Sequence, residues 1–137
     1  MEDYSLGFLL TKSARLIQKQ YEEKLQKHGM TPQQSGVLSI IGAHDGISPA
    51  EIVPKMHSDK ATVSSMLNRL EKLGLIEFHK SQTDGRQRIL RLSSDGKTLL
   101  PEIHRIDAEI SRGMAKGLSN KERAVVHNFL FSLYKST

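Results

Sequence analysis

The chain has 137 residues, a net charge of +5 and a mean hydropathy of −0.41, which fits a single domain. It contains no cysteine, and this excludes disulfides, thiolate nucleophiles and thiol redox switches. Because no apolar run approaches a membrane span and the N-terminus lacks a signal pattern, we expect a cytoplasmic protein with no membrane partner.

Two helices are expected first. Apolar residues recur with helical spacing from Leu6 to Lys27, which predicts a long helix that ends at His28-Gly29. The next segment opens Thr31-Pro32-Gln33-Gln34, which combines an N-cap, a proline at the first helical position and a capping-box glutamine. The residues expected to be buried in this second helix are Val37, Leu38, Ile40 and Ile41.

A short third helix should begin after Ser48. Ser48-Pro49-Ala50-Glu51 is a capping box, and Ile47 and Ile52 stand at the positions of a hydrophobic staple. Pro54 falls inside this segment and removes a helical hydrogen bond, so we expect a kinked or early-ending helix.

The segment from Asp59 to Gly74 carries the clearest functional pattern. One face of the predicted amphipathic helix is apolar, with Val63, Met66, Leu67, Leu70 and Leu73. The opposite face holds small or hydrogen-bonding side chains, namely Lys60, Ala61, Ser64, Ser65 and Asn68. Such a face suits a helix that enters a DNA major groove, and the solvated face of an ordinary core helix is an equal alternative on this segment alone.

A hairpin is predicted next. Leu75–Lys80 and Arg88–Leu92 have strand patterns, and Asp84-Gly85 between them supplies turn chemistry beside Arg86. Residues 55–91 carry eight lysines and arginines against four acidic residues, which favours a polyanionic partner. We interpret the basic-tipped hairpin as the wing of a winged helix-turn-helix.

Two further helices end the chain. The first runs from Ser93 with a kink expected at Pro101, and its apolar stripe is Leu99, Ile103, Ile106, Ile110 and Met114. A capping box at Ser119 starts the second, with Val126, Phe129, Leu130 and Leu133 expected inward. Because the apolar content is only 37% and the terminal helices are far apart in sequence, we expect an intertwined homodimer. A closed monomer is the alternative.

The predicted fold class is mostly α with a small β-hairpin wing (α+β). Residues 31–92 form the winged helix-turn-helix lobe, and residues 1–30 and 93–137 form the dimerisation lobe. An enzyme is disfavoured, since the chain has no Gly-rich phosphate loop, no Gly-x-Ser-x-Gly elbow and no His-x-x-x-His pair. Two alternatives stay open: a winged helix used only for protein contacts, and a metal-responsive regulator with Glu102, His104 and Asp107 as ligands.

Four stretches between residue 29 and about residue 100 are GMTPQQSGVLSIIG, DGISPAEIV, SDKATVSSMLNRLEKLGLIE and TDGRQRILRLSSDGKTLLP. Together they resemble the multiple-antibiotic-resistance regulator (MarR) family, and the Asp84-Gly85-Arg86 sequence of the wing is among the more specific matches. The resemblance implies a homodimeric transcription regulator that binds double-stranded DNA at a pseudo-palindromic operator and uses no cofactor. It implies a recognition helix in the major groove and a wing arginine in the minor groove.

Carried over by position, the resemblance implies DNA contacts at Ser58, Lys60, Ala61, Thr62, Ser64, Ser65, Asn68, Arg69, Asp84, Arg86 and Arg88. Arg86 would be the minor-groove residue, oriented by Asp84, with Arg88 on phosphate. Ser65 stands where the family often has arginine, so more of the specificity is expected from DNA shape. Pro54 is a second departure from the family pattern.

The resemblance also implies a repressor that a small phenolic or lipophilic effector releases from DNA. The effector would bind where the first, second and fifth helices meet. The missing cysteine excludes the thiol-oxidation branch of the family.

Overall fold

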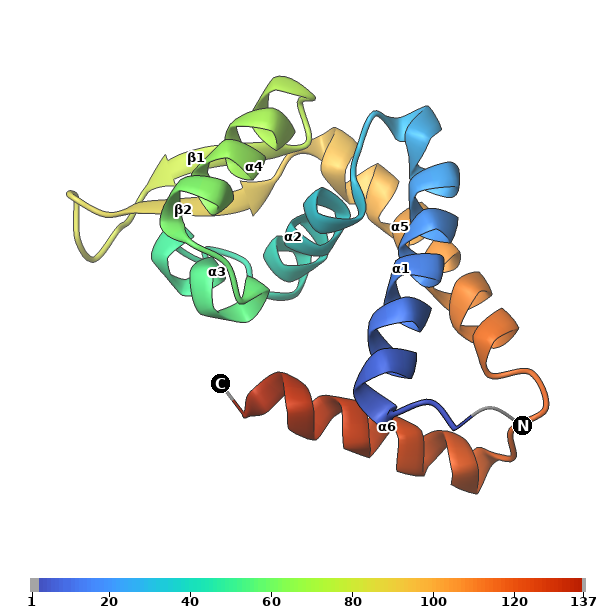
Figure 1. The fold of residues 1–137 in the computed structure, drawn as a ribbon. Coiled ribbons are helices and arrows are strands. Elements are labelled where there is room, and N and C mark those ends of the chain that lie inside the picture. The colour runs from blue at the N-terminus through green and yellow to red at the C-terminus, as the bar shows by residue number, and fades with distance from the viewer. Residues whose placement is uncertain (1–2, 137) are drawn as a thin grey trace.

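The computed structural model describes residues 3–136, in which mostly helical structure carries an antiparallel hairpin that projects from one side (Figure 1). The predicted fold class is confirmed. In chain order the elements are α1 (Leu6–Leu25), the 3-10 helix η1 (Gln26–His28), α2 (Pro32–Ala43), α3 (Pro49–Met56), α4 (Lys60–Lys72), β1 (Ile76–Lys80), β2 (Arg88–Leu92), α5 (Ser94–Met114) and α6 (Asn120–Lys135). Within this part of the chain, none of the helices is long and apolar enough to cross a membrane.

The predicted helix starts are confirmed by their caps. A complete capping box forms at Thr31, Ser48 and Ser119. In each, the hydroxyl oxygen of the cap residue accepts a hydrogen bond from the backbone amide three residues later. The side chain of that later residue in turn accepts a hydrogen bond from the backbone amide of the cap residue. Gly74 has a φ of 74°, the left-handed conformation predicted after α4.

Helix α3 does not end early at Pro54. It runs on through Met56 and ends at His57, which has a φ of 50° and a ψ of 43°. The proline lies in the last turn, so it removes a single hydrogen bond from a helix that is about to stop. The amides of His57 and Ser58 then donate to the carbonyls of Pro54 (3.2 Å) and Val53 (3.3 Å), which closes the helix end.

The hairpin has the predicted strands, and the register runs from the pair Ile76–Leu92 to the pair Lys80–Arg88. A third extended segment, which the sequence did not reveal, pairs with it. Ile47 forms an antiparallel bridge with Leu90, whose amide donates to the Ile47 carbonyl at 2.8 Å. The base of the wing is therefore tied by backbone hydrogen bonds to the loop that precedes α3, which stabilises a two-stranded sheet that would be marginal alone.

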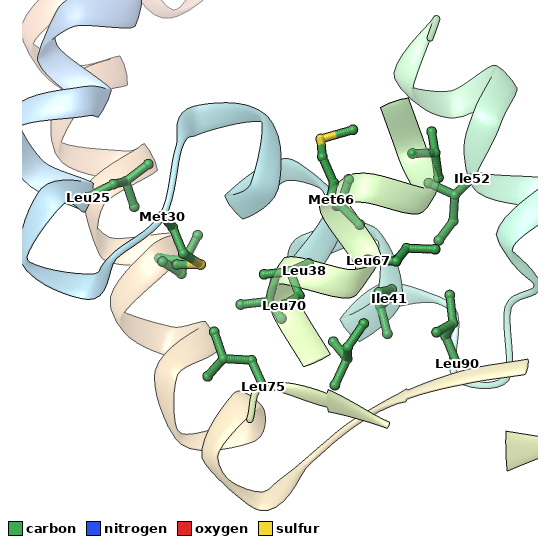
Figure 2. Packing of buried hydrophobic residues seen from close by; sticks show 14 of the residues in the cluster. Leu25, Met30, Leu38, Ile41, Ile52, Met66, Leu67, Leu70, Leu75 and Leu90 are labelled. Atoms are coloured by element: carbon green, nitrogen blue, oxygen red, sulfur yellow. The ribbon is translucent and has the colours of Figure 1, made fainter. Parts of the chain in front are cut away.

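The core lies between α2, α3, α4 and the base of the hairpin (Figure 2). Leu38, Ile52, Leu67 and Leu90 are fully buried there, and Ile103, Ile106 and Ile110 of α5 extend the core toward α1. The α4 stripe is confirmed, since Val63, Met66, Leu67 and Leu70 are all buried.

The terminal helices keep much of their apolar surface exposed. In the single chain, α6 has no buried residue, and the expectation that its stripe points inward is wrong. Its four predicted inward residues are 43–45% exposed: Val126, Phe129, Leu130 and Leu133. On α1, Leu6 and Leu16 are 60% and 63% exposed. One chain does not supply enough surface to cover both helices.

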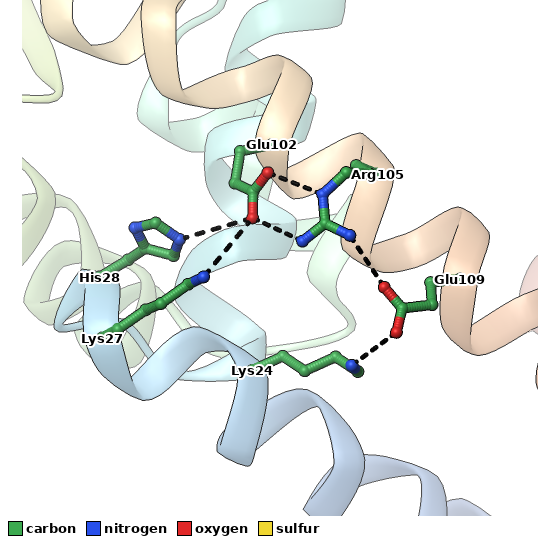
Figure 3. A network of polar contacts seen from close by, with 6 residues as sticks. All are labelled: Lys24, Lys27, His28, Glu102, Arg105 and Glu109. Carbon is green, nitrogen blue, oxygen red and sulfur yellow. Dashed lines mark hydrogen bonds and ion pairs between the residues drawn. The ribbon is translucent and has the colours of Figure 1, made fainter.

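Ion pairs join α1 and η1 to α5 (Figure 3). Arg105 donates to both oxygens of Glu102, at 2.7 and 2.8 Å, and to Glu109 at 2.8 Å. Lys24 donates to the other oxygen of Glu109 at 2.7 Å. The hydrogen bonds from Arg105 lower the pKa of Glu102 to about 2, with smaller contributions from the charges of Arg105, Lys27 and His28. The network connects α5 to the end of α1 and to η1, the segment that leads into α2.

Candidate nucleic-acid interface

Helix α4 presents a free polar face. Its buried stripe packs against α2 and α3, and the predicted contact residues on the other side are all exposed: Lys60, Ala61, Thr62, Ser64, Ser65, Asn68 and Arg69. Ser58, just before the helix, is half-buried. The side chains of the first two turns are short apart from Lys60, so a partner can approach the helix backbone closely.

The N-terminal end of α4 is held by Asp59 and Thr62. The Asp59 carboxylate accepts from the Thr62 amide at 2.7 Å and from the Thr62 hydroxyl at 2.9 Å. These two hydrogen bonds keep the pKa of Asp59 below its ordinary value. The hydroxyl proton of Thr62 is therefore engaged within the chain, and the methyl group and oxygen lone pairs remain for an external partner.

Arg69 lies in the last turns of α4, away from the N-terminal residues. Its Nη2 is 3.5 Å from the carbonyl oxygen of Gly29, forty residues earlier in the chain. This contact joins the recognition helix to the turn between η1 and α2. The guanidinium remains exposed, so it can also face a phosphate.

The wing tip is organised by side chain to backbone hydrogen bonds. Asp84 Oδ1 accepts from the Arg86 amide at 3.0 Å, and the Ser81 hydroxyl oxygen accepts from the amides of Thr83 and Asp84, both at 3.3 Å. Asp84 therefore fixes the backbone at Arg86 in the manner of an Asx turn. The contact is with the amide rather than with the guanidinium, which stays exposed at the tip.

Arg88 has a partner that the sequence did not reveal. Its guanidinium carbon is 4.0 Å from the centre of the Phe78 ring, on the neighbouring strand. Such stacking is typical of a cation–π pair and limits the freedom of the side chain. The sequence pattern predicted only that Phe78 lies in a strand. That Phe78 and Arg88 are diagonal neighbours follows from the pairing of the two strands, in which Phe78 lies opposite Leu90 and Arg88 lies opposite Lys80.

The residues of the metal alternative do not converge. Between residues 3 and 136, no three histidines, aspartates or glutamates lie close enough to hold an ion. The Glu102 carboxylate is directed at Arg105 and Lys27. Asp107 lies beside Tyr21, and burial together with that carboxylate raises the pKa of Tyr21 to about 12. Two of the three candidate ligands, Glu102 and Asp107, are thus engaged with other side chains.

Comparison with known proteins agrees with this arrangement. The sequence model of the MarR family matches residues 28–87. The transcriptional regulator MgrA of Staphylococcus aureus is 27% identical over 131 residues, a match that covers 90% of this chain and 89% of MgrA.

Solved structures share the fold along the whole chain. One is MepR of Staphylococcus aureus in complex with DNA, which has a TM-score of 0.87 and 22% identity and covers 98% of this chain and 100% of MepR. Another is Bordetella bronchiseptica BpsR, whose DNA binding is regulated by 6-hydroxynicotinic acid; its TM-score is 0.86 at 21% identity, and the match covers 99% of this chain and 100% of BpsR. The regulators of this family are not enzymes. The chain therefore resembles transcriptional regulators of the MarR family, in sequence over residues 28–87 and in fold over nearly its whole length.

Proposed function

We propose that this regulator is a homodimeric repressor that reads a pseudo-palindromic operator and leaves it when a small phenolic or lipophilic compound binds. The observation that carries the proposal is the exposed face of α4, where Lys60, Ser64 and Ser65 stand beside short side chains. An α-helix fits the major groove, and serine hydroxyls and an ammonium can reach base edges and phosphates there. The DNA complex of MepR, which has the same fold, supports DNA as the partner.

The wing supplies the second set of contacts. Arg86 at the tip would enter the minor groove, because its backbone is fixed by Asp84 and its side chain is exposed. Arg88, stacked on Phe78, would lie on a phosphate. Such contacts position the protein and respond to DNA shape, which suits a recognition helix with serine rather than arginine at residue 65.

Dimerisation would occur through α1, α5 and α6. The apolar side chains of α6, with Phe129, Leu130 and Leu133 among them, leave more apolar surface exposed than an ordinary monomer does. Pairing two copies about a two-fold axis would bury this surface and present two copies of α4 to successive half-sites.

An effector cavity is available at the junction of the lobes. A cavity of about 450 Å³ opens between α1, the start of α2, the end of α5 and α6, and Ile17, Tyr21, Pro32, Met114 and Leu130 are among its lining residues. This volume suits a compound with one or two aromatic rings. The control of BpsR by 6-hydroxynicotinic acid supports a ligand of this size.

The test is selection of bound fragments from the organism's own genomic DNA, followed by footprinting. We expect a two-fold symmetric footprint. In cells, the protein should repress a reporter gene that is placed downstream of the bound fragment. A small aromatic acid such as salicylate should then release the DNA. If no fragment is enriched above a Ser64→Glu control, DNA readout is wrong and the protein-contact alternative replaces it.

A further inference from the structure

We infer that Tyr134 links α6 to the helix-turn-helix and thereby sets the spacing of the two recognition helices in the dimer. The inference rests on the proposed dimeric, DNA-reading function. Its starting point is the end of α6, which lies beside α3 although the two are far apart in sequence (Figure 1). There the phenolic O–H of Tyr134 donates to the carbonyl oxygen of Lys55 at 2.8 Å, across 79 residues.

The acceptor belongs to the last turn of α3, where helix carbonyls have no partner within the helix. A side chain from α6 therefore caps the first helix of the helix-turn-helix. The ring of Tyr134 also packs edge-on against His57, with 4.7 Å between the ring centres and 78° between the ring planes. One side chain thus contacts both the end of α3 and the residue that turns the chain toward α4.

His57 is an unusual residue to find at this point. It is the one non-glycine residue between residues 3 and 136 with a positive φ, a conformation that costs free energy and persists where neighbouring groups hold it. The Tyr134 ring supplies one such neighbour. Because α3 and α4 pack against each other through Ile52 and the α4 stripe, a group that holds the end of α3 also holds α4.

Two parts of α6 therefore serve different purposes. Its exposed apolar face is the surface proposed to pair with the second copy, and Tyr134, in its last turn, holds the helix-turn-helix of its own chain. The geometry of the dimer is passed to the recognition helix through this hydrogen bond. In a two-fold regulator, the distance between recognition helices determines the half-site separation that binds best.

The experiment uses the full chain and a series of operators whose half-sites are moved apart or together one base pair at a time. Tyr134→Phe removes the O–H and keeps the ring on His57. We expect affinity for the optimal spacing to fall about 3- to 10-fold, which is the loss of one hydrogen bond, while affinity for the neighbouring spacings falls less. The dimer mass should not change. Tyr4→Phe, which removes a hydroxyl from an exposed ring at the other end of the chain, should behave as the wild type.

Hydrogen exchange tests the link without DNA. The amides of His57 and Ser58 should exchange several-fold faster in Tyr134→Phe than in the wild type, while amides of α2 are unchanged. Unchanged exchange at these two amides, or an equal loss of affinity at every spacing, would overturn the inference. Failure of the wild type to bind any operator would overturn the proposed function instead, and the exchange result would still report on the link.

Discussion

The guanidinium of Arg88 lies on the face of the Phe78 ring, with its central carbon 4.0 Å from the ring centre. Arg88 stands directly opposite Lys80 in the hairpin register, and like charges in that position destabilise a hairpin. Stacking on Phe78 holds the guanidinium on the ring face of the residue diagonal to it. A wing that keeps two opposed cations is suited to a partner that supplies negative charge, such as a phosphate backbone.

Phe78→Leu should weaken operator binding about 2- to 5-fold, which corresponds to a cation–π contact of about 0.5–1 kcal/mol. Leucine keeps an apolar side chain against the core but leaves Arg88 unsupported. Phe78→Tyr keeps an aromatic face and should bind as the wild type does. Fluorescence anisotropy titrations measure both variants. If Phe78→Leu and Phe78→Tyr weaken operator binding equally, the cause is a change in packing and not the loss of the aromatic ring that stacks on Arg88.

Ser64→Glu should abolish DNA binding and leave the helix content and melting temperature unchanged. Ser64 is exposed on α4, and its replacement sets a carboxylate against the phosphates while Val63 and Leu67 keep the fold. Ala108→Glu adds the same charge at an exposed position of α5 and serves as the control. Gel shifts and circular dichroism give the two readouts. If the folded Ser64→Glu variant still binds, another element reads the DNA.

The elements of this fold could be predicted because their signals are local. A capping box is complete within four residues, and the α4 stripe needs only its own helical period. The exposed face of α4 followed from the same period. Contacts between distant segments left no such signal: Tyr134 with Lys55, Arg69 with Gly29, and Ile47 with Leu90. Each depends on how segments far apart in the sequence come together in the fold.

Within the candidate site, the sequence identified which residues are exposed but not what holds them. Asp84 was expected to orient Arg86, and the structure adds that it does so through the backbone amide. The engagement of Thr62 by Asp59 and the stacking of Arg88 on Phe78 depend on side-chain rotamers. Pro54 was overestimated as a helix breaker because its cost depends on how close the helix end already is.

Sedimentation at low micromolar concentration should give about twice the 15.4 kDa chain mass. Placing a carboxylate in the exposed apolar face of α6 should dissociate this dimer, because the charge would be buried without a partner. Leu133→Glu is the test, since Leu133 is 45% exposed in the single chain. Lys121→Glu, at the polar start of the same helix, should stay dimeric. A wild type that sediments as a stable folded monomer would exclude the dimer.

The ion pair between Arg105 and Glu102, both on α5, should make the stability of the fold depend on pH in the acid range. Because Arg105 lowers the pKa of Glu102 from 4.5 to about 2, the ionised carboxylate stabilises the folded chain above about pH 4.5. This stability is lost as the pH falls toward 2. Glu102→Gln should therefore melt below the wild type at neutral pH, and the two should converge on acidification.

Thermal unfolding at a series of pH values gives this comparison. Lys27→Gln is the control, because its ammonium is 3.9 Å from the same carboxylate and 66% exposed, so it should change the melting temperature little. A gap between wild type and Glu102→Gln that stays constant from neutral pH to pH 2 would show that the ion pair does not contribute.

Arg86 should read the width of the minor groove. It stands at the tip of a two-stranded element, and the Asp84 side chain fixes its amide at 3.0 Å. A guanidinium is weakly hydrated, so its transfer into a narrow, strongly negative groove costs less than the transfer of an ammonium. Arg86→Ala should weaken specific binding by roughly 1–3 kcal/mol per wing and remove any preference for A·T-rich flanks. Arg86→Lys should recover part of the affinity but little of the preference.

A phosphate contact predicts a different pattern, in which all sequences weaken equally and the dependence of binding on salt becomes shallower. Arg91 provides a comparison within the same hairpin, because its Nε lies 3.5 Å from Asp45 and it stands far from the tip. Arg91→Ala should therefore leave the flank preference intact. Titrating the three variants on A·T-rich and G·C-rich flanks at two salt concentrations separates the two mechanisms. Equal losses for Arg86→Ala on both flanks would make Arg86 a backbone anchor, and the wing would then contribute affinity without reading shape.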